Sequence, residues 1–248
     1  MTPTTARWGS GPRQLGTWWA PSGSGPFPLV VLVHGGYWRP VYDLSLEDEV
    51  AAHLASQGFL VWNVDYAPAG TPWPATLLDA AAAYDHGVRD GRVDTSRVAV
   101  VGHSAGGHLA LWLGSRRAGT PGGAPDVAPA LVVGQAPVAC LALGHEQRLG
   151  DGAVGLLVGG SPASYPDRYA EADPLALLPV DTPTVLIHGE ADDVVPLSQP
   201  ETYAAASSAR LVVVPGGHFE HLDPRSEAIA ALLEALQALG PAAAALGG

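Results

Sequence analysis

The chain has 248 residues, a length that fits one α/β domain and can bury a full hydrophobic core. All twelve basic residues are arginine, and 24 acidic residues give a formal net charge of −12 at pH 7. This balance argues against nucleic acid or an anionic membrane surface as a partner, because binding phosphates requires clustered cations. The single cysteine, Cys140, excludes an internal disulfide and a cysteine-based metal site.

Apolar segments alternate with helix-like segments, which predicts an α/β fold: a mostly parallel sheet with helices on both faces. The first two strands are expected to pair antiparallel across a turn-rich connection, residues 21–28. The expected strands are Arg13–Ala20, Leu29–His34, Phe59–Asp65, Arg97–Val101, Ala130–Pro137, Thr184–His188 and Ala209–Val214. The expected helices are Leu44–Gln57, Pro74–Val88, Gly106–Arg117, Leu197–Ser207 and Pro224–Leu239.

One stretch, Leu141–Pro179, does not fit this alternation and is too long for a plain connection. We expect it to form a small cap of short helices over the site, within a single domain spanning residues 1–248. Gly240–Gly248 is predicted to be a frayed tail. Met1–Gly11 lacks the apolar core of a signal peptide, and no apolar run has the length of a membrane span. A cytoplasmic location is therefore expected.

The motif Gly-His-Ser-Ala-Gly at residues 102–106 follows the apolar strand Arg97–Val101 and precedes a helix. This context is typical of a nucleophile elbow, in which a sharp strand-to-helix turn exposes a serine hydroxyl above a parallel sheet. The flanking glycines permit the crowded backbone that the turn demands. Ser104 is the candidate nucleophile.

A serine hydroxyl needs a general base, and the base needs an acid that orients it. Acidic residues follow the strand that ends at position 188, and histidines follow the last strand, in the order expected for such a fold. Asp192 and Asp193 are adjacent, so only one can face the histidine, and Asp192 is favoured. His218, directly after two glycines, is favoured over His221. The predicted triad is Ser104, His218 and Asp192.

The segment His-Gly-Gly-Tyr-Trp at residues 34–38 also follows a strand. Its glycine pair lets the main chain turn N–H groups towards a substrate oxygen. The N–H groups of Gly36, Tyr37 and Ala105 are therefore predicted to form the oxyanion hole, which stabilises the charge that develops on an attacked carbonyl. His34 is expected to orient this loop rather than to transfer a proton.

With these motifs in order, the chain resembles an α/β-hydrolase of the serine esterase type. The segment at residues 34–38 resembles that of the arylformamidase (kynurenine formamidase) family, and the Asp-Tyr-Ala-Pro segment from Asp65 echoes the hormone-sensitive-lipase-like esterases. Those esterases usually carry a third glycine where this chain has Tyr37. The resemblance implies hydrolysis of N-formylkynurenine-like aryl formamides without a metal or cofactor. Tyr37, Trp38 and Trp73 are then expected to border the substrate pocket, alongside the 141–179 segment.

Two alternatives remain open at this point. A carboxylesterase acting on short-chain acyl esters would use the same residues, so the motifs do not separate a formamide from an ester as the small-molecule substrate. A non-catalytic hydrolase-fold binding protein is the other alternative, and reaction of Ser104 with a fluorophosphonate would distinguish it. The sequence does not indicate the oligomeric state.

Overall fold

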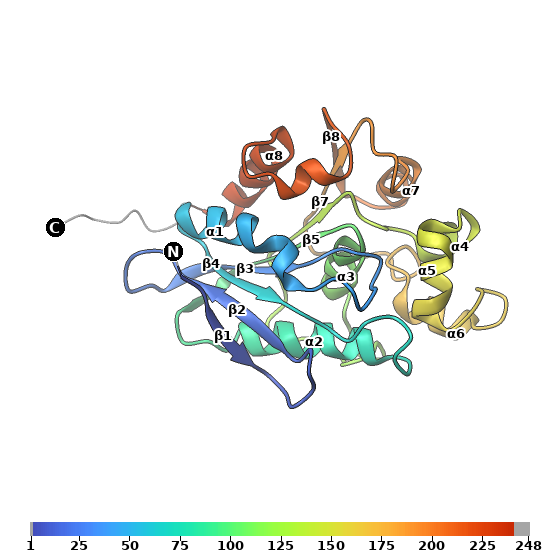
Figure 1. Cartoon of the computed structure of the whole chain (residues 1–248), viewed down its shortest axis with the longest axis horizontal. Helices are drawn as coiled ribbons and strands as arrows, with labels where there is room; N and C mark the ends of the chain where they lie inside the picture. Colours follow the sequence, from blue (N-terminus) through green and yellow to red (C-terminus); the bar gives the residue numbers. More distant parts are fainter. Residues whose placement is uncertain (1, 241–248) are drawn as a thin grey trace.

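The computed structural model describes residues 2–240, and in this part of the chain eight strands form one sheet (Figure 1). Their order is β1-β2-β4-β3-β5-β6-β7-β8, with β1 and β2 antiparallel to their neighbours and the other pairings parallel. The strands are β1 Thr4–Arg7, β2 Leu15–Trp19, β3 Phe27–Val33, β4 Leu60–Val64, β5 Val93–His103, β6 Leu131–Gln135, β7 Thr184–Gly189 and β8 Arg210–Val214.

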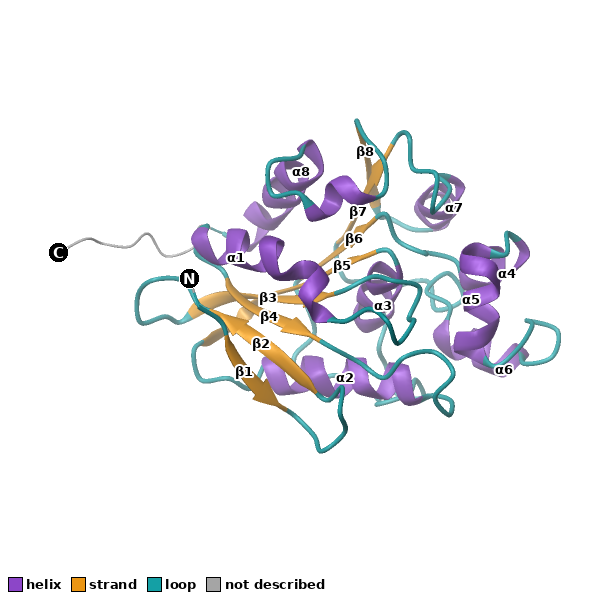
Figure 2. Ribbon diagram, viewed as in Figure 1, coloured by secondary structure: helices purple, strands orange, loops and turns teal. Residues whose placement is uncertain are grey.

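Helices cover both faces of the sheet (Figures 1 and 2), as predicted. Alternate side chains of β3 enter two separate cores: Leu29 packs in the core that includes α2 and α3, and Val30 in the core that includes α1 and α8. The α-helices are α1 Asp48–Ser56, α2 Ala75–Gly87, α3 Ala105–Gly114, α4 Leu141–Glu146, α5 Leu149–Val158, α6 Pro166–Ala172, α7 Ser198–Ala206 and α8 Glu227–Leu236. The 3₁₀-helices are η1 Leu44–Glu47, η2 Phe219–Leu222 and η3 Gln237–Leu239.

The predicted antiparallel pairing of the first two strands is wrong. β2 pairs with β1, a strand that was not predicted, and with β4, whereas β3 lies in parallel between β4 and β5. All seven residues of β3 are buried, so this strand has apolar side chains on both faces and belongs in the centre of a parallel sheet. β2 is only partly buried and lies nearer the edge.

The 141–179 segment forms the short helices α4, α5 and α6, which pack beside α3 (Figure 2). Two side chains of α3 contact backbone carbonyls near the end of α6: His108 Nε2 lies 3.0 Å from Ala172 O, and Trp112 Nε1 donates to Glu171 O at 2.8 Å. The predicted tail lies outside the described residues except for Gly240. Among residues 2–240, no helix has the length and apolar character needed to cross a membrane.

The turn from β5 into α3 depends on two glycines that allow backbone segments to touch. A Cβ added at Gly102 would lie 2.1 Å from Gly106 O, and one added at Gly106 would lie 2.0 Å from Val33 O. Between them Ser104 has φ 58° and ψ −117°, a left-handed conformation that costs free energy for a residue with a side chain. The packing of α3 against β3 and β5 holds the serine in this strained geometry.

Replacing Gly106 by alanine should therefore destabilise the fold. The new methyl group would meet the backbone of β3, which cannot rotate away, so we expect the free energy of unfolding to fall by about 3 kcal/mol. Gly91→Ala is the matched control, because an added Cβ there meets no atom within 4 Å. Chemical denaturation of both variants measures the difference, and equal stabilities would contradict this account of the elbow.

Candidate active site

Ser104 lies at the carboxyl end of the central strand β5, where the turn holds its backbone from two sides. Its N–H donates to Gln135 O at 2.8 Å, and its carbonyl accepts from the N–H of Val138 at 3.2 Å. The residue is 2% exposed. Because these bonds join the serine to the end of the neighbouring strand β6, its side chain is presented from a rigid part of the sheet.

His218 and Asp192 are joined by a short hydrogen bond, and His218 lines the same cavity as Ser104. The imidazole Nδ1 donates to Asp192 Oδ2 at 2.7 Å, and both side chains are almost fully buried. The other carboxylate oxygen accepts the N–H groups of Val194 and Val195 at 2.9 and 2.8 Å. Burial acts to raise the pKa of Asp192, but the bond from His218 and these backbone donors outweigh it, so its pKa lies below the ordinary value.

Of the two adjacent carboxylates, the structure brings Asp192 to the histidine, whereas Asp193 is exposed. Of the two histidines, His218 contacts Asp192, whereas His221 is buried beside Gln135, whose Nε2 lies 3.4 Å from the His221 Nδ1. Burial lowers the pKa of His221 to about 3, so this imidazole is neutral at physiological pH.

Two further histidines surround the pair. His103 Nε2 donates to the backbone carbonyl of His218 at 2.9 Å, and their rings lie 4.6 Å apart. His188 Nε2 donates to Val195 O at 2.9 Å and lies 3.4 Å from Asp192 Oδ2. Burial lowers the pKa of both His103 and His188, so neither carries a charge that would compete with His218 for the carboxylate.

The loop after β3 passes directly beside Ser104. A Cβ added at Gly35 would lie 3.1 Å from Ser104 Cβ. Within the described chain, no acceptor is found for the N–H groups of Gly36 and Tyr37, and Ala105 begins α3, where a backbone N–H has no intrahelical acceptor. These three N–H groups are therefore left without an acceptor in the described chain.

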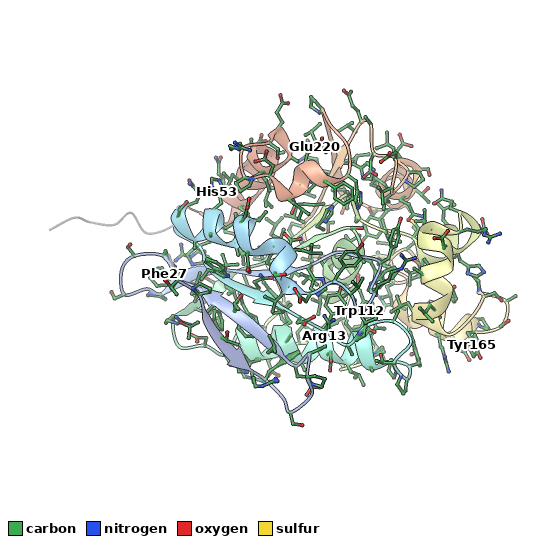
Figure 3. All side chains as sticks on the ribbon, viewed as in Figure 1. Arg13, Phe27, His53, Trp112, Tyr165 and Glu220 are labelled. Carbon is green, nitrogen blue, oxygen red and sulfur yellow. The ribbon has the colours of Figure 1, made fainter. Side chains whose placement is uncertain are left out.

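A buried polar network holds the loop after β3 in place. His34 Nδ1 lies 2.8 Å from Gly35 O and its Nε2 lies 3.2 Å from Asp65 Oδ1. Tyr66 stacks on the His34 ring and donates its hydroxyl proton to His34 O at 2.8 Å. Arg13, labelled in Figure 3, contacts both Asp65 oxygens and also donates to the carbonyl of Tyr42. The Asp-Tyr pair of the sequence motif thus holds the loop and does not line the cavity that contains Ser104.

A cavity of about 200 Å³ is lined by both Ser104 and His218. Sequence reasoning missed most of its wall, which comes from the residues just after the glycine loop and just after His218. The position of these residues directly after the glycine loop and directly after His218 was the sequence signal that could have identified them, because both segments must run close to the site. The missed lining residues are Arg39, Tyr42, Leu46, His103, Val194, Phe219 and Leu222.

Of the three aromatic residues expected at the pocket, Tyr37 lines the cavity and the two tryptophans do not. Tyr37 lines the cavity, and its hydroxyl donates to Val194 O at 2.9 Å, which joins the glycine loop to the loop that carries Asp192. Trp38 is not among the lining residues: it is 1% exposed and packs edge-on against His108. Trp73 is also absent from the wall and lies under Arg168 of α6. The predicted pocket role is wrong for both tryptophans.

The 141–179 segment also contributes no residue to the cavity wall. It approaches the site through Gly150, where the ring of Tyr37 lies so close that an added Cβ would be 2.7 Å from it. The predicted short helices are present, but they pack behind Tyr37 rather than against the space beside Ser104. The expectation that they border the substrate pocket is therefore wrong for this cavity.

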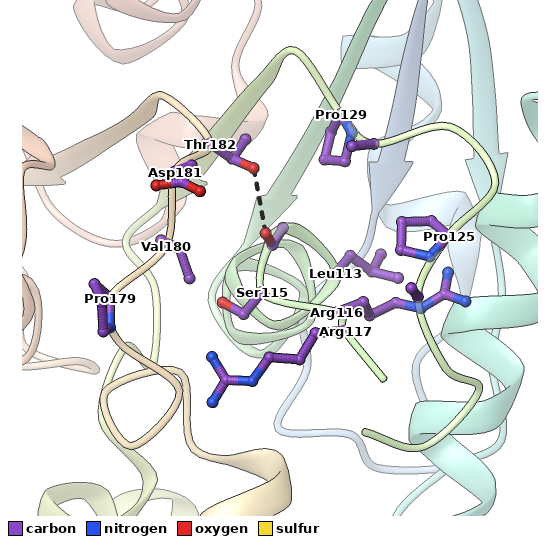
Figure 4. Close-up of a pocket in the computed structure, with 13 residues that line it drawn as sticks. Leu113, Ser115, Arg116, Arg117, Pro125, Pro129, Pro179, Val180, Asp181 and Thr182 are labelled. Carbon is purple, nitrogen blue, oxygen red and sulfur yellow. Dashed lines mark hydrogen bonds between the residues drawn. The ribbon is translucent and has the colours of Figure 1, made fainter. Parts of the chain in front are cut away.

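A second cavity, of about 360 Å³, lies at the opposite end of α3 from Ser104 (Figure 4). Its two arginines are already engaged: Arg116 pairs with Asp85 at 2.8 Å, and Arg117 donates to Leu177 O at 2.8 Å. Thr182 bonds to the carbonyl of Gly114 across it. With these groups used for structure, this cavity presents no grouping of a nucleophile with a base.

Two mycobacterial proteins are similar to this chain over most of its length. Esterase LipC of Mycobacterium tuberculosis is 28% identical over 234 residues, which cover 84% of this chain and 58% of LipC. The uncharacterized protein Rv2307c of the same organism is 31% identical over 225 residues, covering 83% of this chain and 68% of that protein. The chain therefore spans little more than half of LipC.

Among solved structures, esterase B from Lactobacillus rhamnosis superposes with a TM-score of 0.80 at 23% identity, covering 96% of this chain and 84% of that one. This likeness establishes the α/β-hydrolase fold predicted from the sequence. The BD-FAE family model matches residues 17–206, which include the glycine loop, Ser104 and Asp192. The chain is a member of the BD-FAE family.

Proposed function

We propose that the protein is a serine carboxylesterase that hydrolyses short-chain acyl esters, with Ser104 as nucleophile, His218 as general base and Asp192 as the group that orients it. The 2.7 Å contact between His218 and Asp192, beside the cavity that His218 shares with Ser104, carries this proposal. A carboxylate bound to Nδ1 keeps the proton there and leaves Nε2 free to accept a proton.

In this mechanism Ser104 Oγ attacks the ester carbonyl while His218 takes the hydroxyl proton. The carbonyl oxygen becomes negative and is stabilised by the N–H groups of Gly36, Tyr37 and Ala105, each worth about 10²–10³ in rate in comparable sites. His218 then passes the proton to the departing alkoxide, which leaves an acyl ester on Ser104. Water, activated by the same histidine, releases the acid and restores the serine.

The relatives support an ester rather than a formamide as substrate. LipC is named an esterase, and esterase B has been solved with a tributyrin phosphonate inhibitor. Neither of these proteins is described as an aryl formamidase. They therefore give no specific support to the activity that the His-Gly-Gly-Tyr-Trp resemblance predicts. The size of the cavity also suits a short acyl chain, because about 200 Å³ lies below the usual range for sites that hold drug-sized molecules.

Direct comparison of the two substrate classes tests the proposal. We expect kcat/KM for 4-nitrophenyl acetate to exceed that for N-formylkynurenine with the same preparation, with negligible formamide cleavage. A preference for the formamide by several decades would instead identify an aryl formamidase, since the amide is intrinsically the harder bond.

Single substitutions test the assigned roles. Ser104→Ala should abolish labelling by a fluorophosphonate and lower kcat by about 10⁴ or more, and Asp192→Asn should lower it by about 10⁴ because the imidazole loses its orienting charge. Asp193→Asn makes the same change at the next residue, whose side chain is exposed, and its kcat should stay within about threefold of the wild-type value. Equal losses in the two asparagine variants, or turnover by Ser104→Ala, would overturn the assignment.

The pH profile should report one histidine. A general base must be neutral to accept a proton, so kcat/KM should be full at higher pH and lower in acid. Burial lowers the pKa of His103 and lowers that of His221 to about 3, so both neighbouring imidazoles are neutral at physiological pH. The pKa of Asp192 is also below its ordinary value, so the carboxylate stays ionised. A flat profile between about pH 5 and 8, with the fold intact by circular dichroism, would contradict a histidine base.

A further inference from the structure

The cavity beside Ser104 contains one guanidinium that the mechanism above does not use. Among the described residues that line this cavity, Arg39 is the one arginine, and neither aspartate nor glutamate is present. The other lining side chains are histidine, serine, tyrosine and apolar residues. A cationic residue thus lines the same cavity as the proposed nucleophile, without an acidic partner among the described lining residues.

The guanidinium of Arg39 makes one hydrogen bond and one long ion pair with the described residues. Its Nη2 donates to Gly150 O at 2.8 Å, while its ion pair with Asp151 measures 3.9 Å and that carboxylate is fully exposed. An ion pair of this length in solvent contributes little. By contrast, Arg116 approaches its carboxylate to 2.8 Å and is buried. The charge of Arg39 is therefore only weakly paired, and apart from these two contacts its guanidinium N–H donors have no acceptor among the described residues.

The backbone ties Arg39 to the residues proposed to bind the substrate carbonyl. Its N–H donates to Gly36 O at 3.0 Å, which closes a turn, and its Cζ lies 6.0 Å from the centre of the Tyr37 ring. The side chain is 42% exposed, so it reaches solvent and is open to a ligand. A substrate with its carbonyl at the glycine loop therefore shares the cavity with this cation.

The rest of the wall and the overall charge narrow the ligand class. Leu46 and Leu222 give the cavity an apolar surface, and Tyr42 and Phe219 border it. A single cation above an apolar wall matches a molecule with a short hydrocarbon part and an anionic end. The net charge of −12 repels anions at long range, so such a molecule has to be selected by direct contact.

We propose that Arg39 is a specificity-determining residue and that the cognate substrate is an ester carrying a carboxylate, which the guanidinium binds while the ester carbonyl lies at Ser104. The planar fork of N–H donors matches a carboxylate in a bidentate arrangement. This inference rests on the proposed esterase function and adds the chemical class of its substrate.

Two matched pairs of esters test it and locate the carboxylate. 4-Acetoxybenzoate and neutral 4-acetoxybenzamide place the charge on the alcohol side, and mono-4-nitrophenyl glutarate and neutral 4-nitrophenyl butyrate place it on the acyl side. Both pairs are corrected for spontaneous hydrolysis. The quantity measured is the ratio of kcat/KM for the charged ester to that for the neutral one, in wild type, Arg39→Gln, Arg39→Lys and Arg89→Gln.

In at least one pair, Arg39→Gln should lower this ratio by about tenfold or more, because a charge-assisted hydrogen bond is lost, and Arg39→Lys should retain part of it. Arg89→Gln removes the same charge from an exposed pair with Asp126 and should change the ratio by less than about twofold. Equal ratios in wild type and Arg39→Gln for both pairs, with neutral esters still hydrolysed, would overturn this inference alone. Failure of the wild type to hydrolyse any of the four esters would overturn the proposed function and this inference with it.

Discussion

The site is built on one close backbone approach, that of Gly106 at the start of α3 to the carbonyl of Val33 at the end of β3. An added Cβ would lie 2.0 Å from that oxygen and 2.5 Å from His34 O, so this contact exists only because the residue is glycine. It brings the loop after β3 against the turn that carries Ser104. Both the strained backbone of the serine and the position of the N–H donors at Gly36 and Tyr37 follow from it.

The buried His103 connects the turn at Ser104 to the loop that carries His218. His103, the last residue of β5, donates to the backbone carbonyl of His218, which lies after β8. The chain between these strands is long, and this bond acts together with the contact to Asp192 to fix the position of His218. Burial keeps His103 neutral by lowering its pKa, and a neutral imidazole can make this bond without repelling a protonated His218.

Tyr37 makes its contacts from a backbone position that favours glycine. Its φ is 51°, a conformation that glycine adopts without strain but that costs free energy for a residue with a side chain. The tyrosine side chain offsets that strain by bonding to Val194 O and by packing on Gly150. It thereby connects the glycine loop, the loop of Asp192 and the short helices, and it lines the cavity together with Arg39.

The sequence alone determined the parts of this protein that depend on local chemistry. Alternating apolar and helical segments specified the sheet and its covering helices, and glycines at fixed spacing around Ser104 specified the elbow, because each signal lies within a few residues. The order of Asp192 and His218 along the chain identified the candidate pair before any distance was known.

Only the tertiary structure decided which segments meet. Strand β3 pairs with β4 and β5 rather than with β2, because burial of both its faces is a property of the whole sheet. Trp38 and Trp73 lie away from the cavity, and Arg39 and Leu222 line it, because a cavity wall is assembled from side chains distant in sequence. Residue type and local spacing carry no information about such contacts, so the proposed specificity at Arg39 became visible only in three dimensions.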